Sequence, residues 1–330
     1  MTAAQEHARP FWTTPVARAL MALLMVVAIG AIFNADGAFF KWSIHRDMLR
    51  QTSVYGILAC GMTVVVITAG IDLSVSSVLA LSAVLFAWLT LPLGWSATAA
   101  IVTVAASGTA LGCVSGALVA YLRVQPFIVT LAMMVFARGL AKMVSGGQKI
   151  TNFALAADGS STVVDLPPIF ALIDRRVLGG NISAVTIIFL VCVLVTWLVL
   201  HRFRLGRHIY AVGGNEEAAR LSGVPVPRTL LTAYGLSGLF AAVAGICQAA
   251  QETQGDPETG MAYELDAIAM VVIGGTALSG GRGGIVLTLV GVLTIGYLQK
   301  ILSLNAAPEA TRLMLTGGII IGAVLFQRRR

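Results

Sequence analysis

The sequence predicts an all-α, polytopic membrane protein that crosses the bilayer in about ten helices. Hydrophobic residues make up 57% of the chain and charged residues only 11%, whereas soluble domains carry about 25% charged residues. Many apolar stretches reach the length of about 20 residues that one membrane-spanning helix needs. The short alternating strands of a membrane barrel are missing from the sequence. Helices follow, because a backbone in lipid must satisfy its own hydrogen bonds.

Residues 1–330 are expected to form a single transmembrane domain. The first apolar stretch follows a polar N-terminus, as in a secretory signal, but no small-x-small cleavage site is clear, so we interpret it as a retained helix. Segments rich in polar residues, glycine or proline separate the later stretches. In chain order, the expected spans cover residues 17–33, 51–70, 73–91, 97–121, 126–144, 182–201, 229–250, 263–279, 284–302 and 311–326.

Lysine and arginine residues set the expected orientation, because cytoplasmic loops carry more of them than external loops. With the loop 202–228 and the C-terminus inside, about twelve basic residues face the cytoplasm and about six face outward. The N-terminus is then also cytoplasmic, and 146–181 is the one long external loop. Segment 34–50 is either an interfacial helix or part of the second span. The basic residues that decide this threading are Arg202, Arg204, Arg207, Arg220, Arg228, Arg328, Arg329 and Arg330.

Missing motifs exclude several classes of function. The 4 cysteines lie inside apolar segments without paired spacing, so neither a disulfide framework nor a zinc site is expected. The chain has no phosphate-binding loop, HExxH helix or GxSxG elbow, so we expect no catalytic residue, metal site or cofactor in it. The basic residues flank apolar spans instead of forming one stripe, which argues against nucleic acid as a partner.

Small residues recur at helical spacing in two of the expected spans. This pattern lets two helix backbones approach closely. The approach is either between helices of one chain or between subunits. The residues are Gly108, Gly112 and Gly116 in one span and Ser237, Ala241 and Gly245 in another.

Asp72 lies in the middle of the apolar run "VVVITAGIDLSVSSVLALSA". One interpretation makes it a buried helix cap that accepts from the backbone amide of Ser74 or Val75, with Gly70 permitting the chain reversal. The alternative places Thr68, Asp72 and Ser74 along a polar path through the membrane, because ionisable residues inside a membrane are functional candidates.

The segment "GGNEEAARLSG" predicts a short helix with both ends marked. Asn215 is a good N-cap, acidic residues suit the first turn, and Gly223 ends the helix. Such a helix either docks onto a cytoplasmic partner or rests on lipid headgroups. The candidate docking residues are Asn215, Glu216, Glu217, Ala218, Arg220, Leu221 and Gly223.

The stretch "LSGGR" lies between two apolar spans and predicts a tight hairpin at the cytoplasmic side. Gly280 and Gly281 permit a positive φ there, as do Gly283 and Gly284, and Arg282 marks the cytoplasmic surface. The hairpin follows "VIGGTALS" (272–279), which faintly repeats "VITAGIDLS" (66–74).

Four stretches together make the chain similar to a known family. They are "GMTVVVITAGIDLSVSSVLALSA", "QPFIVTLAMMVFARGL", "GRHIYAVGGNEEAARLSGV" and "YELDAIAMVVIGGTALSGGRGG". The chain resembles the membrane permeases of bacterial ABC-type monosaccharide importers, the group that includes ribose, xylose and arabinose permeases. It departs from the usual motif at Ala69 and Ser76, where that family has glycine.

The resemblance implies a permease subunit in the bacterial cytoplasmic (inner) membrane that works as a dimer, expected to be a homodimer. A separate ABC ATPase binds ATP and docks on the 206–224 loop, and an extracytoplasmic binding protein delivers a monosaccharide. Amino acids or another small solute are alternative cargoes, and an ion-coupled carrier is a further alternative that the shortage of membrane acids disfavours. No cluster of aromatic residues and carboxylates for a sugar is evident along the sequence. Independently of the resemblance, polar residues inside spans either line a path or make hydrogen bonds between helices: Thr63, Thr68, Gln125, Thr130, Gln248 and Gln299.

Overall fold

The computed structural model describes residues 14–155 and 161–308 and, beyond them, 310–312, 314, 315, 317, 318 and 321. Each of the expected spans up to 284–302 coincides with a helix, whereas most of 311–326 and the tail Arg328–Arg330 lie outside the described residues. The helices that match expected spans are α1 (Pro15–Ile32), α2 (Trp42–Ile67), α3 (Val75–Thr90), α4 (Ala97–Leu122), α5 (Pro126–Ser145), α7 (Ala184–His201), α10 (Val226–Glu252), α11 (Tyr263–Gly274) and α12 (Ile285–Leu304).

Among the described residues, 6 helices are long and apolar enough to cross a membrane: α2, α4, α5, α7, α10 and α12. Residues 16–32 and α3 are apolar but shorter, and α11 spans only 12 residues. The expectation of about ten spans is therefore approximate, but the prediction of a helical multi-pass membrane protein is confirmed. Most of segment 34–50 belongs to α2, which begins at Trp42 after a 3-10 turn, η2 (Ala38–Phe40).

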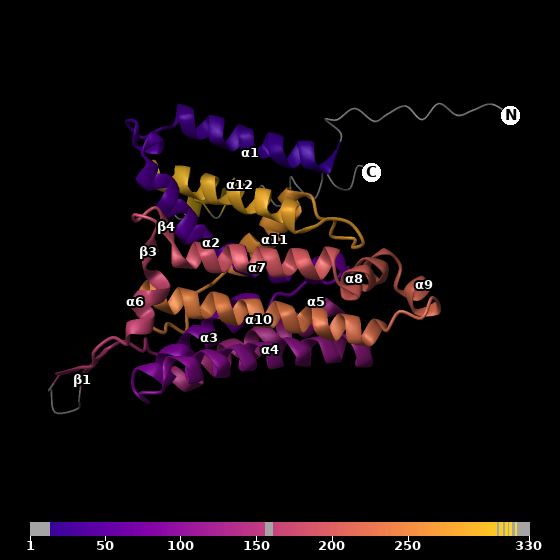
Figure 1. The fold of residues 1–330 in the computed structure, drawn as a ribbon, viewed down its shortest axis with the longest axis horizontal. Coiled ribbons are helices and arrows are strands. Elements are labelled where there is room, and N and C mark those ends of the chain that lie inside the picture. Colours follow the sequence, from indigo (N-terminus) through magenta and orange to yellow (C-terminus); the bar gives the residue numbers. More distant parts are fainter. Residues whose placement is uncertain are drawn as a thin grey trace.

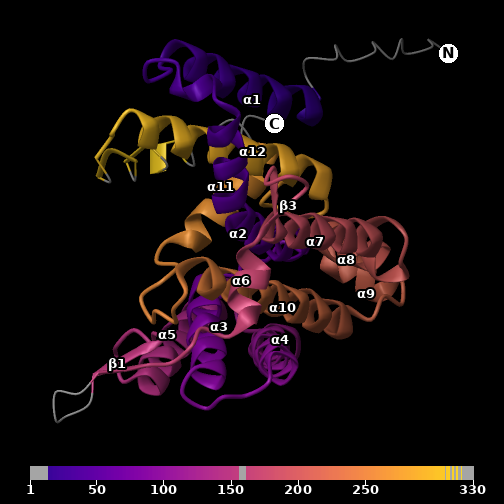
Figure 2. The same ribbon diagram turned by 60° about the vertical axis from the view of Figure 1, so that its left-hand side comes forward.

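Helix α10 is central, with α4 and α3 on one side and α2 on the other (Figures 1 and 2). Helix α2 in turn contacts α7, α11 and α12, and α1 is outermost against α12. The glycine stripe of α4 packs within the chain: a Cβ at Gly112 would overlap the carbonyl oxygen of Tyr234 on α10, and one at Gly238 would overlap that of Gly108. The intramolecular interpretation of the stripe is thus confirmed.

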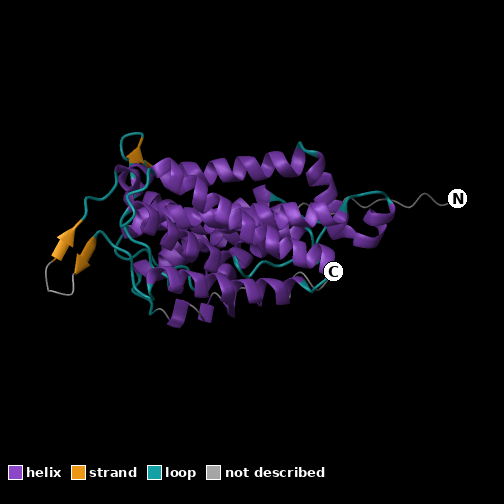
Figure 3. Ribbon diagram, turned by 90° about the horizontal axis from the view of Figure 1, so that it is seen from below, coloured by secondary structure: helices purple, strands orange, loops and turns teal. Residues whose placement is uncertain are grey.

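The two ends of the bundle differ in structure. Strands and most loops gather at one end, called here the strand end (Figure 3). The expected external loop contains the hairpin β1 (Phe153–Leu155) and β2 (Ser161–Val163), the helix α6 (Pro168–Asp174) and the pair β3 (Arg176–Val177) and β4 (Ile182–Ser183). At the opposite end, the α9 end, α8 (Arg204–Gly214) and α9 (Glu216–Leu221) protrude from the bundle (Figure 1).

Candidate functional site

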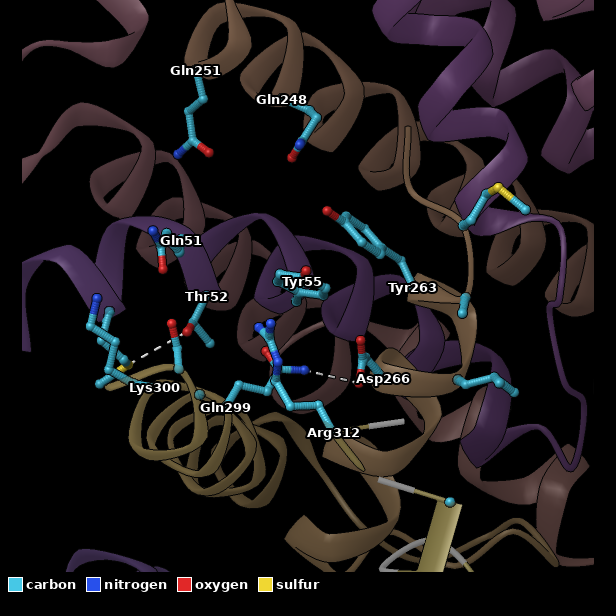
Figure 4. A pocket seen from close by; sticks show the side chains of 17 residues that line it. Gln51, Thr52, Tyr55, Gln248, Gln251, Tyr263, Asp266, Gln299, Lys300 and Arg312 are labelled. Carbon is cyan, nitrogen blue, oxygen red and sulfur yellow. Dashed lines mark hydrogen bonds between the residues drawn. The ribbon is translucent and has the colours of Figure 1, made fainter. Parts of the chain in front are cut away.

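A polar cavity of about 720 Å³ lies among α2, α10, α11 and α12, in the half of the molecule that carries the strands (Figure 4). Its walls come from the first half of α2, the last turns of α10, the first turns of α11 and the last turns of α12. Residues of the 310–318 segment add to the lining. The polar lining residues are Gln51, Thr52, Tyr55, Gln248, Gln251, Tyr263, Asp266, Gln299, Lys300, Ser303 and Arg312.

Aromatic rings and side-chain amides meet in this cavity (Figure 4). The rings of Tyr55 on α2 and Tyr263 on α11 lie with centroids 4.2 Å apart and planes tilted by 39°. On the α10 wall, Gln251 donates a 3.1 Å hydrogen bond to the carbonyl oxygen of Arg50. Rings offer a surface for C–H groups, and amides both donate and accept hydrogen bonds. The lining therefore suits a small solute that carries several hydroxyl groups.

One acidic and two basic side chains also line the cavity. Gln299 on α12 donates a 3.1 Å hydrogen bond to Asp266 on α11, which fixes the carboxylate against the opposite wall. Lys300 and Arg312 complete the charged lining, and the Nε atom of Arg312 is buried without a hydrogen-bond partner among the described residues. Charged groups of both signs give the cavity several strong, oriented hydrogen-bonding positions.

The segment 253–262 joins α10 to α11, and its residues Met261 and Ala262 line the cavity; we call this segment the cavity rim. It is fastened to α5, because Arg138 donates to the carbonyl oxygens of Pro257 (2.7 Å) and Thr259 (2.8 Å). Lys142 pairs with Glu258 at 2.6 Å. Arg138 and Lys142 of α5 therefore both hold this segment, Lys142 with its side chain 49% exposed.

The predicted capped helix is confirmed as α9. The Oδ1 atom of Asn215 accepts a 2.9 Å hydrogen bond from the amide of Ala218, and Gly223 has a φ of +81° after the helix end. Arg220 makes a 2.6 Å ion pair with Glu217, and this hydrogen bond raises the pKa of Arg220. Leu221 is 81% exposed. The candidate docking residues 215–223 thus form one protruding surface, which also carries an uncovered apolar side chain.

Asp72 is buried between α2 and α3, where it accepts hydrogen bonds from the amide of Ser74 (3.0 Å) and from the hydroxyl of Ser237 on α10 (2.7 Å). The hydroxyl of Ser74 also donates to it. Of the two amides predicted as alternative donors, that of Ser74 makes the bond, and the bond from Ser237 on α10 is an addition that the sequence did not predict. Thr68 donates within its own helix end, to the carbonyl oxygen of Val65 at 2.7 Å. Thr68, Asp72 and Ser74 do not line the cavity described above.

The chain reversal before Asp72 differs from the expectation. Ala69, not Gly70, has a positive φ, at +63°. Position 70 requires glycine for a different reason: a Cβ there would overlap the hydroxyl of Tyr234. The second reversal follows the prediction at three of its four glycines: Gly280, Gly281 and Gly283 have φ values of +82°, +70° and +128°, whereas Gly284 is extended, with a φ of 165°. Arg282 is exposed.

Known proteins similar to this chain are transport permeases. The family described as "Branched-chain amino acid transport system / permease component" matches residues 45–324. The ribose import permease protein RbsC of Escherichia coli (strain K12) is 39% identical over 316 residues, covering 95% of this chain and 94% of that protein. The fructose import permease protein FruF of Bifidobacterium longum (strain NCC 2705) is 35% identical over 93% of this chain and 86% of that protein. The xylose transport system permease protein XylH of E. coli (strain K12) is 33% identical over 92% of this chain and 91% of its own length.

No solved structure matches the chain. The family assignment thus rests on the match over most of the sequence. The chain belongs to this permease family. The permease is accordingly a multi-pass membrane protein, as the resemblance of its four motifs to importer permeases implied. The matched residues include the cavity, α9 and the Asp72 turn.

The cavity of the permease includes some of the polar residues that the sequence predicts along a path. Gln248 and Gln299 were expected along a polar path and do line it, whereas Thr63, Gln125 and Thr130 do not. No cluster of aromatic and acidic residues is evident along the linear sequence, but the folded chain contains one. Tyr55, Tyr263 and Asp266 come from separate helices, and the fold brings them together. The motif "YELD" held two of these residues, but polar residues at a span end equally suggest an interface anchor.

Proposed function

We propose that this permease is the membrane-spanning subunit of an ATP-driven importer and that it carries a monosaccharide through the polar cavity. The cavity carries the argument, because glutamine amides, two tyrosine rings and a carboxylate converge there from four helices. Sugars present hydroxyl groups that donate and accept hydrogen bonds and C–H faces that pack on rings. Ribose, fructose and xylose permeases at 33–39% identity support the same class of cargo.

A second cargo deserves a test, because the matched family is described by branched-chain amino acids. Asp266 on one wall and Lys300 with Arg312 near it offer the two charges that an amino-acid zwitterion needs. Apolar side chains also reach the lining, from Met48 and Leu265. The amide-rich walls and the sugar permeases among the relatives favour the monosaccharide.

The partners follow from the two ends of the molecule. In this proposal the α9 end faces the cytoplasm, with both termini on that side, and a separate ABC ATPase docks on residues 215–223. The exposed Leu221 and the capped helix support this docking role. A loop that only connects two spans needs neither a capped helix nor an exposed apolar side chain. ATP binds to that partner chain. The strand end faces outward and receives the sugar from a binding protein, and two permease chains form the transport unit.

Reconstitution tests the proposed function. The permease is placed in proteoliposomes with a candidate ATPase and a binding protein from the same genome, and uptake of a radiolabelled pentose or hexose is measured. We expect uptake only with ATP and the ATPase, inhibited by unlabelled sugars and unaffected by leucine or valine. Uptake driven by a sodium or proton gradient without the ATPase would identify a secondary carrier instead. Competition by branched-chain amino acids and not by sugars would reassign the cargo.

The docking role of α9 has its own test. Arg220→Glu reverses a charge on α9 and places three acidic side chains side by side. We expect about tenfold lower uptake with the protein still inserted in the membrane, as for the loss of a charged contact. Arg228→Glu makes the same change on an exposed residue outside α9 and serves as the control. Equal uptake by Arg220→Glu and wild type would remove α9 as the docking element.

A further inference from the structure

Three separate segments meet backbone to backbone near the base of α9. They are the end of α2 with its reversal (67–70), the end of α8 (213–214) and the reversal between α11 and α12 (275–284). The amide of Gly281 donates a 2.9 Å hydrogen bond to the carbonyl oxygen of Ile67. The hydroxyl of Tyr210 on α8 donates a 2.9 Å hydrogen bond to the carbonyl oxygen of Gly283. We call this contact the glycine junction.

The glycine junction has no room for side chains. A Cβ at Gly213 would overlap the carbonyl oxygen of Ile67 and come within 2.7 Å of the amide nitrogen of Gly281. A Cβ at Gly280 would come within 2.7 Å of both Ala69 Cβ and the carbonyl oxygen of Gly213. Backbone contacts of this kind have no rotamers that absorb a displacement. Close-packed elements therefore transmit a shift as a whole.

Each segment of the glycine junction continues to an element with an expected role. Asn215, the cap of α9, directly follows Gly214. Residues 69–74 lead to Asp72, which accepts the hydrogen bond from Ser237 on α10. Residues 275–284 join α11 to α12, the helices that carry Asp266 and Gln299 on the cavity walls. The junction thus includes the ends of α8 and α2, and it is linked to the other three helices around the cavity, which are α10, α11 and α12.

We propose that the glycine junction transmits the movement of α9 to the cavity walls, with Gly213 as its positioning residue. This inference rests on the proposed function, because it takes α9 as the ATPase-docking element. A displacement of α9 moves Gly213 and Gly214, and these two residues then displace both reversals at the same time. The ends of α2, α11 and α12 at the junction then shift as a unit, and their opposite ends change the width of the cavity. Gly213 touches neither cargo nor ATPase in this mechanism.

Two adjacent glycines provide a matched test. Gly213→Ala forces the carbonyl oxygen of Ile67 away, whereas Gly214→Ala meets nothing within 4 Å. Both residues belong to α8, so helix propensity changes equally. In reconstituted permease with its ATPase, we expect Gly213→Ala to hydrolyse ATP at near wild-type rate while sugar moved per ATP falls about tenfold or more, since overpacking by a methyl group displaces well-packed elements. Gly214→Ala should match wild type.

A second readout reports on the cavity itself. Ser303 lines the cavity and is exposed, so Ser303→Cys reports cavity access by its rate of labelling with a water-soluble thiol reagent. The background carries Cys113→Ala, because the other three native cysteines are buried. ATP should change the labelling rate in wild type and in Gly214→Ala but not in Gly213→Ala. A variant that merely lost stability would lower the yield of folded protein without removing this response from the folded fraction.

Tyr210→Phe keeps the test decisive if Gly213→Ala does not fold. It removes one hydrogen bond of the junction and no volume, so sugar moved per ATP should fall about 2- to 10-fold. The proposal is overturned if folded Gly213→Ala and Gly214→Ala transport equally per ATP, or, where Gly213→Ala is unfolded, if Tyr210→Phe equals wild type. Failure of the proposed function is distinct, because wild-type permease itself would then show no ATP-driven uptake.

Discussion

The two ends of this permease differ in how closely the same helices pack. Near the α9 end, glycines at the end of α8 and in the reversal between α11 and α12 lie backbone to backbone against the end of α2. At the strand end, residues from the first half of α2 and from the last turns of α12 line a cavity of about 720 Å³. We call the closely packed end the locked half and the cavity end the open half. In the proposed mechanism, a small displacement in the locked half changes the width of the cavity in the open half.

The strand end is also fastened differently. Side chains contribute to holding the cavity rim, through the ion pairs Lys142–Glu258 and Lys149–Asp256, together with the backbone pair of Gly255 and Ile150. The hydrogen bond that Lys149 donates to the carboxylate of Asp256 raises the pKa of Lys149, but ion pairs whose lysine is exposed to solvent contribute little to stability. The rim is thus held by separate polar contacts, whereas the glycine junction is held by close packing of backbone on backbone.

Breaking the locked half should have the largest effect. Gly112→Leu drives a side chain into the carbonyl oxygen of Tyr234 on α10, and we expect at least about 3 kcal/mol of destabilisation from this overpacking. Folded protein should be largely lost, as measured by the yield of monodisperse permease in detergent. Gly139→Leu is the control, since a Cβ at that exposed position meets nothing within 4 Å. Equal yields for the two variants would contradict the close approach of α4 and α10.

The sequence could predict the locked half better than the open half, for a physical reason. Two helix backbones approach closely only where small residues recur at regular spacing. Gly108 and Gly112 therefore predict a close helix contact even when the partner helix is unknown. The cap on Asn215 and the glycine hairpin are likewise local, because the residues that form them are neighbours in the chain. The cavity is a product of tertiary packing: Tyr55 and Tyr263 lie 4.2 Å apart between ring centroids but far apart in sequence, and no local pattern links them.

Asp72→Ala should have the next largest effect. It leaves the amide of Ser74 and the hydroxyl of Ser237 buried without their acceptor, which costs about 2–4 kcal/mol and lowers Tm by several degrees. Ser82→Ala is the control, because its buried hydroxyl has no hydrogen-bond partner among the described residues, so its loss should leave Tm nearly unchanged. Thermal unfolding in detergent measures both. A smaller loss for Asp72→Ala than for Ser82→Ala would show that the turn does not depend on its carboxylate.

A change in the open half should affect transport and spare stability. Asp266→Asn keeps the shape of the side chain but removes its charge, and with it the strength of a charge-assisted hydrogen bond to cargo. We expect the apparent KM for uptake to rise about tenfold while Tm stays within about a degree. Asp256→Asn changes a carboxylate of the rim, outside the lining, and should leave KM unaltered. A drop in Tm without a change in KM would show that Asp266 stabilises the fold and does not bind the cargo.

The smallest predicted effect concerns backbone strain inside the glycine junction. Ala69 adopts a φ of +63°, a left-handed conformation that costs a residue with a Cβ about 1–2 kcal/mol and costs glycine little. Ala69→Gly relieves this strain but frees the unfolded chain, so the free energy of unfolding should rise by only about 0.5–1 kcal/mol. The same substitution at Ala110, which is exposed in the interior of α4, should lower it by about 1 kcal/mol, because a right-handed helix gains nothing from glycine. Opposite signs, measured by denaturant unfolding in detergent, would show that the junction keeps its tight geometry at the expense of a strained residue. Losses of equal size would mean that the methyl group of Ala69 contributes more by its contact with Gly280 than its backbone conformation costs.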